Sequence, residues 1–230
     1  IAVNNYDDPA YSDLNNPIDD ALKLKKVLID NYNFQKDNFY ILENPTKNEI
    51  LEEFQNLTEK VDSNDHVLIF YAGHGKYYEE YNEGYWLGSD AEKNKRYTWI
   101  SNDDIIRDIK YINSKNTLLI ADACFSGSLF SDFRSVNDNR EKKSYVKRME
   151  IPSRKIITSG DKEVVQDNSV FMKYMLQKLN DNQKLYISAE DLYNQIKKPV
   201  MINSENQQEP KFGSILKTSG EGGDFVFTHR

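Results

Sequence analysis

The sequence predicts an α/β fold in which a mostly parallel sheet carries helices on both faces. Two observations lead to this prediction. Short apolar segments alternate with longer segments of helical periodicity along the chain, an order typical of parallel sheets. Two apolar segments, residues 66–75 and 117–124, are hydrophobic without alternation, which indicates strands that are covered on both faces.

The first half of the chain is expected to contain three strands and two helices. Residues 1–3 are predicted to end a strand, and strands are also expected at 38–42 and 66–75. A helix over 16–32 has Asn16 as its N-cap and Pro17 at its first position. The helix over 46–61 opens with Thr46 and Glu49, which form a capping box.

The second half continues the alternation. Helices are predicted over 101–112, 169–179 and 188–198, and strands over 117–124, 155–159 and 223–227. Residues 131–155 and 203–214 show weak periodicity and are expected to form loops.

Composition excludes several classes of protein. The chain has 230 residues, a formal net charge of −7 and one cysteine. An isoelectric point near 5.1 disfavours general nucleic-acid binding, and no apolar run approaches the roughly 18 residues of a membrane span. A lone cysteine forms no internal disulfide, which fits a cytoplasmic protein. The first residue is Ile within a predicted strand, so we expect a fragment of a longer protein.

Two of the central strands end in residues suited to nucleophilic chemistry. His74 lies in "YAGHG" and Cys124 in "DACFSG", 50 residues apart. Because the carboxyl ends of parallel strands share one edge of the sheet, the two side chains are expected to meet there. The imidazole would take the thiol proton, and the backbone N–H groups of Gly75 and Cys124 would form an oxyanion hole. The alternatives are a buried structural thiol and a turn histidine.

These two motifs at this spacing resemble the caspase-like cysteine proteases, which include caspases, metacaspases and bacterial relatives. The resemblance implies a three-layer sandwich with a sheet of about six strands, forming one peptidase domain over residues 1–230. It implies a large-subunit-like part over 1–130, a processing loop over 131–155 and a small-subunit-like part over 156–230. It also implies a role in regulated cell death or defence, with a sensor domain or regulatory partner.

The same resemblance suggests which substrates are cleaved. Caspases have Gln two positions before the cysteine, whereas this chain has Asp122, as metacaspases that cleave after Arg or Lys do. Asp20, in "DDA", matches a second acid of that pocket, and Ser159 in "SGDK" is a candidate for holding substrate. Two carboxylates favour a cationic side chain and repel a substrate Asp. Asp20 is also explained as an acid in the first turn of a helix.

The expected loop over 131–155 is rich in basic residues, so an enzyme of this specificity would process itself there. The candidate cleavage sites are Arg134, Arg140, Lys143 and Arg148. A solvated linker is the alternative. No cofactor is expected to be required. Calcium is a candidate ligand of Asp103 and Asp104, although Asp104 is also explained as a capping residue.

Three other functions remain as alternatives. They are a peptidase with acidic (Asp) specificity, a catalytically silent scaffold or adaptor, and a nucleotide-binding domain. Asp122 argues against the first, and the presence of both Cys124 and His74 argues against the second. The chain contains no P-loop or dinucleotide-binding motif, which disfavours the third. The aromatic run over 77–86 is expected either to line a substrate cleft or to pack as a loop.

Overall fold

The computed structural model describes residues 1–123, 129–130, 145–160, 168–205, 208–215 and 222–230. Cys124 and the predicted cleavage sites Arg134, Arg140 and Lys143 lie outside these ranges.

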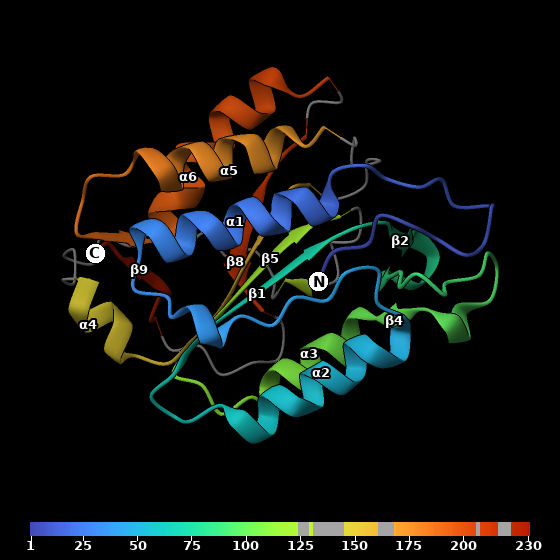
Figure 1. The fold of residues 1–230 in the computed structure, drawn as a ribbon, viewed down its shortest axis with the longest axis horizontal. Coiled ribbons are helices and arrows are strands. Elements are labelled where there is room, and N and C mark those ends of the chain that lie inside the picture. The colour runs from blue at the N-terminus through green and yellow to red at the C-terminus, as the bar shows by residue number, and fades with distance from the viewer. Residues whose placement is uncertain (124–128, 131–144, 161–167, 206–207, 216–221) are drawn as a thin grey trace.

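A mixed, mostly parallel sheet forms the centre of the molecule, as predicted (Figure 1). Its strand order is β1-β5-β6-β8. The strands β1 (His66–Ala72), β5 (Asn116–Asp122) and β6 (Ser153–Thr158) are parallel, and β8 (Lys211–Ser214) pairs antiparallel with β6. The described sheet therefore has four strands, where about six were expected.

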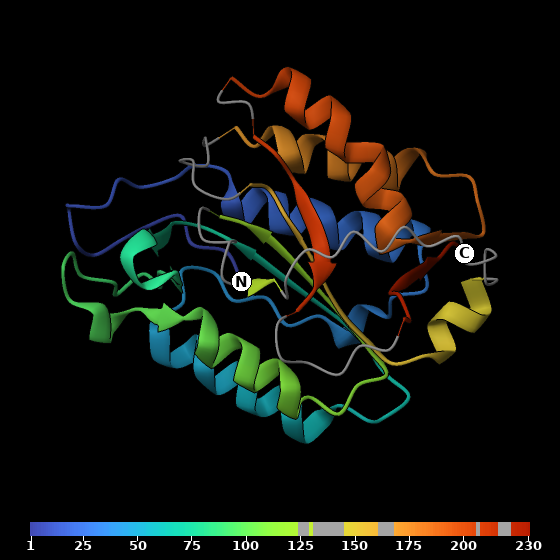
Figure 2. The ribbon, with the colours of Figure 1, turned by 180° about the vertical axis from the view of Figure 1, so that it is seen from behind.

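Helices cover both faces of this sheet (Figures 1 and 2). One face carries α1 (Pro17–Asn31), α5 (Val170–Asp181) and α6 (Ala189–Asn203), and the other carries α2 (Lys47–Lys60) and α3 (Asn102–Tyr111). Alternate residues of β5 enter the two cores, with Leu118 and Ile120 on the first face and Leu119 on the second. This double burial explains why the strand is apolar without alternation.

Two expected strands at the edge of the sheet form only in part. Ala2 makes isolated parallel bridges to Ala72 and to Glu43, so residues 1–3 run between β1 and the segment that ends at Glu43. The predicted strand over 38–42 is not a strand. A short 3-10 helix, η1 (Lys36–Asn38), precedes an extended segment that enters no ladder among the described residues.

Several short elements lie where the sequence predicted loops. β8 lies within the expected loop 203–214, and α4 (Tyr145–Glu150) lies within the expected loop 131–155. A separate two-stranded antiparallel sheet pairs β7 (Tyr186–Ser188) with β9 (Val226–Thr228). β9 overlaps the strand predicted over 223–227. Such short segments contain too few residues to show a period.

The aromatic run over 77–86 packs as a small antiparallel sheet. It comprises β2 (Gly75–Tyr78), β3 (Glu83–Trp86) and β4 (Ile100–Ser101), with the 3-10 helices η2 (Glu79–Tyr81) and η3 (Arg96–Thr98) beside it. Asn82 makes the turn with a φ of 50°. Trp86 is fully buried, and its ring lies 4.3 Å from that of Tyr71. The packing interpretation of this run therefore holds for Trp86.

The helix starts show which capping predictions were correct. Thr46 and Glu49 form the predicted capping box of α2, and the Ser101 hydroxyl accepts the Asp104 N–H at the start of α3. Asn16 stands at the N-cap position of α1 but makes no side-chain capping bond. Instead, the Asn4 side-chain oxygen accepts the N–H of Ile18 at 2.9 Å. No helix in the described part of the chain is long and apolar enough to span a membrane.

Candidate active site

The carboxyl ends of β1 and β5 lie side by side. Ala72 and Asp122 are partners in the parallel register, and they are the last residues of their strands. His74 follows β1 by two residues, and Cys124 follows β5 by two residues. The segments that follow β1 and β5 thus leave the same edge of the sheet at the same register, although Cys124 itself lies outside the described residues.

Gly73 allows the sharp approach to His74. Its φ is +157°, and a Cβ atom there would lie 3.0 Å from the Tyr6 Oη, 3.1 Å from the Tyr71 Oη and 3.2 Å from the Val3 Cβ. A side chain there would crowd these atoms and would adopt a backbone conformation that is rare outside glycine, so the position favours glycine.

A backbone carbonyl fixes the orientation of the His74 ring. The Nε2 atom lies 2.8 Å from the Ser12 oxygen. Because a carbonyl oxygen only accepts, this bond places the proton of the neutral ring on Nε2 and leaves the lone pair on Nδ1. The sequence indicated no group that orients the histidine, since a backbone carbonyl leaves no sequence signature.

The loop that supplies the Ser12 carbonyl also packs on the imidazole. Ring centroids lie 4.8 Å apart for Tyr6 and His74 and 6.2 Å apart for Tyr11 and His74. The backbone N–H of His74 donates to the Tyr6 hydroxyl at 2.7 Å, and the Tyr71 hydroxyl donates to the His74 carbonyl at 2.7 Å. Neither tyrosine was predicted to belong to the site.

Asp122 is a buried carboxylate with an unused oxygen. Its residue is 3% exposed, and its Oδ1 atom has no hydrogen-bond partner in the described structure. Burial raises the pKa of Asp122 to about 6, and the nearby hydroxyls of Ser169 and Ser159 offset only part of this shift. A buried acceptor without a partner is costly, so this atom needs an explanation.

Ser159 joins Asp122 at the same edge. Its N–H donates to the Ala121 carbonyl at 3.1 Å, which places it beside the end of β5. The Ser159 Oγ and the Thr158 Oγ1 are also buried and have no hydrogen-bond partner among the described residues. Three polar side-chain atoms without partners therefore come from the adjacent ends of β5 and β6.

The N-terminal part of α1, which carries Asp20, lies near this edge. The Asn16 side-chain amide donates to the Asn168 side chain at 3.2 Å, and Asn168 precedes Ser169, whose hydroxyl acts on Asp122. The Asp20 side chain is 15% exposed and lies 4.0 Å from the Lys23 ammonium. The start of α1, four residues before Asp20, thus meets the segment that leads into Ser169, whereas Ser159 lies beside the end of β5.

A family model described as a caspase domain matches residues 1–218. The chain belongs to this family. It is therefore a caspase-like peptidase domain, and membership of this peptidase family implies that its substrates are proteins.

Several solved structures share this fold. The chain is similar to protein GSU0716 from Geobacter sulfurreducens, with 14% identity, a TM-score of 0.61 and coverage of 92% of this chain and 89% of that one. It is similar to pro-sf-caspase-1, with 15% identity, a TM-score of 0.60 and coverage of 94% and 86%. It is also similar to the Drosophila initiator caspase Dronc, with 13% identity, a TM-score of 0.55 and coverage of 93% of this chain and 77% of that one. No curated protein matches the chain by sequence.

Two further predicted site residues, Gly75 and Arg148, lie in secondary-structure elements of this caspase-like domain. Gly75 begins β2 directly after His74. Arg148 lies in α4, where its guanidinium contacts the fully buried Asp224 at 3.0 Å and Glu190 at 2.5 Å. A helical, ion-paired arginine is a poor protease site, so the setting of Arg148 does not favour its prediction as a cleavage site.

The calcium candidates have other partners or no visible site. Asp104 caps α3 and pairs with the Arg107 guanidinium at 2.7 Å. The described residues contain no group of three or more His, Cys, Asp and Glu side chains placed to hold a metal.

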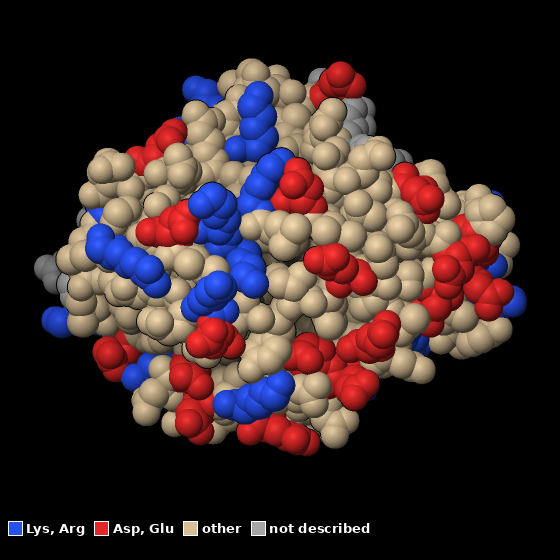
Figure 3. All heavy atoms as spheres, in the orientation of Figure 1, with Lys and Arg blue, Asp and Glu red and all other residues tan. Residues whose placement is uncertain are grey.

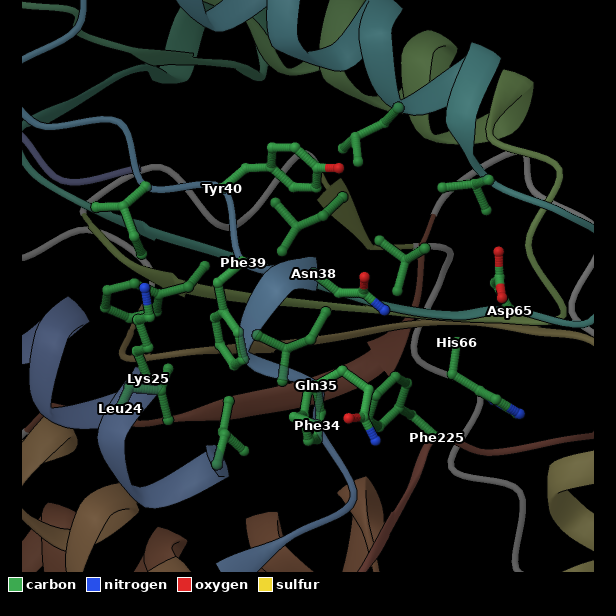
Figure 4. Close-up of a pocket in the computed structure, with 18 of the residues that line it drawn as sticks. Leu24, Lys25, Phe34, Gln35, Asn38, Phe39, Tyr40, Asp65, His66 and Phe225 are labelled. Atoms are coloured by element: carbon green, nitrogen blue, oxygen red, sulfur yellow. The ribbon is translucent and has the colours of Figure 1, made fainter. Parts of the chain in front are cut away.

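A large cavity lies away from the predicted site residues (Figure 4). It encloses about 580 Å³ beside β1 and the segment over 38–42, and mostly apolar side chains line it. Phe34, Phe39 and Tyr40, from the chain around η1, line it together with Phe225. His66 lies at its right-hand end in Figure 4. Among the described residues, none of His74, Asp122, Asp20 and Ser159 lines it, so it is not the candidate active site.

Proposed function

We propose that this caspase-like domain is a cysteine endopeptidase that cleaves proteins after Arg or Lys. The observation that carries the proposal is the buried carboxylate of Asp122, which has an unused oxygen at the edge of the sheet shared with His74. Asp122 precedes Cys124 by two residues, so a substrate side chain held by Asp122 would place its carbonyl carbon close to the thiol.

His74 and Cys124 would carry out the chemistry as a dyad. With Nε2 held by the Ser12 carbonyl, Nδ1 is the ring nitrogen that accepts the proton of the Cys124 thiol. The thiolate attacks the substrate carbonyl, and the backbone N–H groups of Gly75 and Cys124 stabilise the oxyanion. The imidazolium then gives its proton to the leaving amine, and water hydrolyses the thioester.

Asp122, with Asp20 and Ser159, would select the residue before the scissile bond. A guanidinium or ammonium group donates to the free Oδ1 of Asp122 and supplies the partner that this atom lacks. A hydrogen bond to a charged group is worth about 1.5–3 kcal/mol. A substrate carboxylate would face a buried carboxylate instead and would be rejected.

The surface charge is compatible with basic substrates. Figure 3 shows acidic side chains at the right-hand end of the molecule, beyond the place where Figure 1 labels β2, the strand that follows His74. Acidic surroundings raise the local concentration of cationic segments.

The proposal extends to self-processing between the two parts of the domain. Arg134, Arg140 and Lys143 are the proposed cleavage sites, within the basic segment that follows the nucleophile. Regulated cell death or defence, under the control of a sensor domain or partner, is the proposed biological role. Mass spectrometry of the active enzyme is expected to show cleavage in this segment, and an intact segment would remove this extension.

Covalent labelling tests the proposed function directly. The protein is incubated with peptidyl acyloxymethyl ketones that carry Arg or Asp at the position before the reactive group, with and without calcium. We expect the arginyl reagent to add one equivalent to Cys124 and the aspartyl reagent to add none. The variants Cys124→Ser and His74→Ala should not be labelled. Labelling by the aspartyl reagent alone would support the acidic-specificity alternative, and no labelling at all would favour a silent scaffold.

A further inference from the structure

Tyr6 makes two separate contacts with His74. Its hydroxyl accepts the backbone N–H of His74 at 2.7 Å, and its ring lies 4.8 Å from the imidazole at an interplanar angle of 41°. Tyr6 is 8% exposed. It therefore contacts both the backbone and the side chain of the predicted general base from the buried side.

Tyr6 is itself held firmly by its own loop. Its backbone N–H donates to the Asp13 carboxylate at 2.9 Å, and the backbone N–H of the next residue, Asp7, donates to the Ser89 carbonyl at 2.9 Å. The same loop supplies the Ser12 carbonyl that accepts the Nε2 proton. The loop that contains Tyr6 and Ser12 thus contacts His74 at three places: the Nε2 atom, the imidazole ring and the backbone N–H.

We propose that Tyr6 is a positioning residue for His74, acting through its hydroxyl on the backbone and through its ring on the charged imidazolium. The proposal rests on the proposed function, because it assigns Tyr6 to the Cys124–His74 dyad. The hydroxyl accepts the N–H of His74, the residue after Gly73, where a Cβ atom would lie only 3.0 Å from the Tyr6 Oη. An aromatic ring beside a cation stabilises the cation, so the ring would favour the thiolate–imidazolium form of the dyad.

The other groups near the imidazole make different contacts. Tyr11 contributes a more distant ring at 6.2 Å, and the Tyr71 hydroxyl binds the His74 carbonyl. Asp13 is bound to the Tyr6 backbone. Tyr6 is therefore the nearest aromatic ring that the described structure places against His74.

Two substitutions separate the two contacts. Tyr6→Phe removes the hydroxyl and keeps the ring, whereas Tyr6→Leu removes both. The matched control is Tyr32, a fully buried tyrosine whose hydroxyl donates to the Leu179 carbonyl at 2.7 Å and whose ring lies 5.5 Å from that of His229. Tyr32→Phe and Tyr32→Leu make the same chemical changes beside a histidine that has no predicted role.

Two readouts are measured on each variant. The first is kcat and KM for an arginyl peptide, and the second is the pH dependence of Cys124 alkylation by iodoacetamide, which reports the thiolate. Misplacement of a catalytic group lowers kcat more than it raises KM, so we expect a loss in kcat of about 10- to 100-fold for Tyr6→Leu and about 3- to 10-fold for Tyr6→Phe. The alkylation midpoint should rise by about half to one pH unit in Tyr6→Leu and stay unchanged in Tyr6→Phe.

The outcomes distinguish this proposal from the proposed function. If Cys124→Ala or His74→Ala retains peptidase activity, the dyad is wrong and both proposals fall. If those variants are inactive but Tyr6→Leu keeps the wild-type kcat and alkylation midpoint, only the role of Tyr6 is wrong. The role is also wrong if the Tyr32 variants show the same changes as the Tyr6 variants. Should Tyr6→Leu fail to fold, a wild-type kcat in Tyr6→Phe would overturn the assignment of the hydroxyl.

Discussion

Asp122 and Asp224 are two buried aspartates with the same electrostatic problem and different solutions. Asp122 is 3% exposed and Asp224 is 0% exposed, and burial raises the pKa of each to about 6. The Asp224 carboxylate accepts from the Arg148 guanidinium at 3.0 Å and from the N–H groups of Glu190 and Phe225 at 3.2 and 2.9 Å. Asp122 has an oxygen with no partner in the described structure.

The difference separates a structural carboxylate from one that is suited to a ligand. Asp224 holds α4 and the start of α6 together, because Arg148 comes from α4 and Glu190 from α6. Asp122 stands at the edge of the sheet beside Ser159, whose hydroxyl also has no hydrogen-bond partner there, and no protein cation satisfies Asp122 in the described residues. We therefore expect a substrate to bring to Asp122 what Arg148 brings to Asp224.

The largest expected effect is the loss of cleavage in Asp122→Asn. Removing one partner of a buried charge pair costs about 2–5 kcal/mol, so kcat/KM for arginyl peptides should fall about 30- to 5,000-fold. In Asp224→Asn the folded enzyme should keep its preference for Arg over Asp. A steady-state comparison of the two variants checks this, and equal losses of preference would erase the distinction between the two aspartates.

The next effect is on stability and concerns the other aspartate. Arg148→Met leaves the buried Asp224 without its cation, and we expect a loss of about 2–4 kcal/mol in the free energy of unfolding. Arg107→Met is the control, because Arg107 pairs with Asp104 at an exposed position, where a pair is worth about 0–1 kcal/mol. Urea denaturation of the two variants measures the difference, and similar losses would contradict the role given to Asp224.

The pH dependence of stability should reveal the cost of the unpaired carboxylate. The pKa of Asp122 rises from its ordinary 3.8 to about 6 on folding, so across this window the folded protein keeps a proton that the unfolded chain releases. Stability from this group is therefore present at low pH and is lost as pH rises through 3.8 to about 6.

Asp122→Asn removes this loss. We expect the variant to gain about 1–3 kcal/mol over the wild type as pH rises across the window and to keep the gain at pH 7. Unfolding free energies at pH 4 and pH 7 test this. A variant that is less stable than the wild type at pH 7, with no change between the two pH values, would contradict the account of Asp122.

The smallest effect is expected for Glu190→Gln. Its side chain is 48% exposed, and Arg148 keeps Asp224 as a partner when the charge of Glu190 is removed. The free energy of unfolding should change by less than about 1 kcal/mol, as is usual for exposed pairs. Denaturation beside Arg148→Met provides the measurement, and a loss as large as that of Arg148→Met would move the stabilising role from Asp224 to Glu190.

The sequence predicted what depends on long patterns and on local capping. The unbroken apolar strands β1 and β5 and the capping box at Thr46 and Glu49 were found because each has a strong local signature. β8 and α4 were missed because their few residues show no period, and their formation depends on neighbours distant in the sequence. The strand expected at 38–42 failed because an apolar run alone does not ensure a ladder partner.

The candidate site divides in the same way. His74, Asp122, Asp20 and Ser159 were named from motifs, and the structure places Asp122 and Ser159 at the sheet edge that His74 follows, with Asp20 on α1. The Ser12 carbonyl and Tyr6 were not predicted, because a backbone acceptor has no residue type and the contact of Tyr6 spans 68 residues of sequence. Arg148 was named as a cleavage site from its basic side chain alone, because the sequence does not reveal its ion pair with Asp224.

The most direct test of the central claim is a panel of fluorogenic peptides that differ only in carrying Arg, Lys, Asp or Ala before the scissile bond. It is run on the wild type and on Cys124→Ala, with and without calcium. The account predicts cleavage after Arg or Lys that disappears in the variant, with no cleavage after Asp. Cleavage after Asp, or cleavage after Arg that survives in Cys124→Ala, would contradict it.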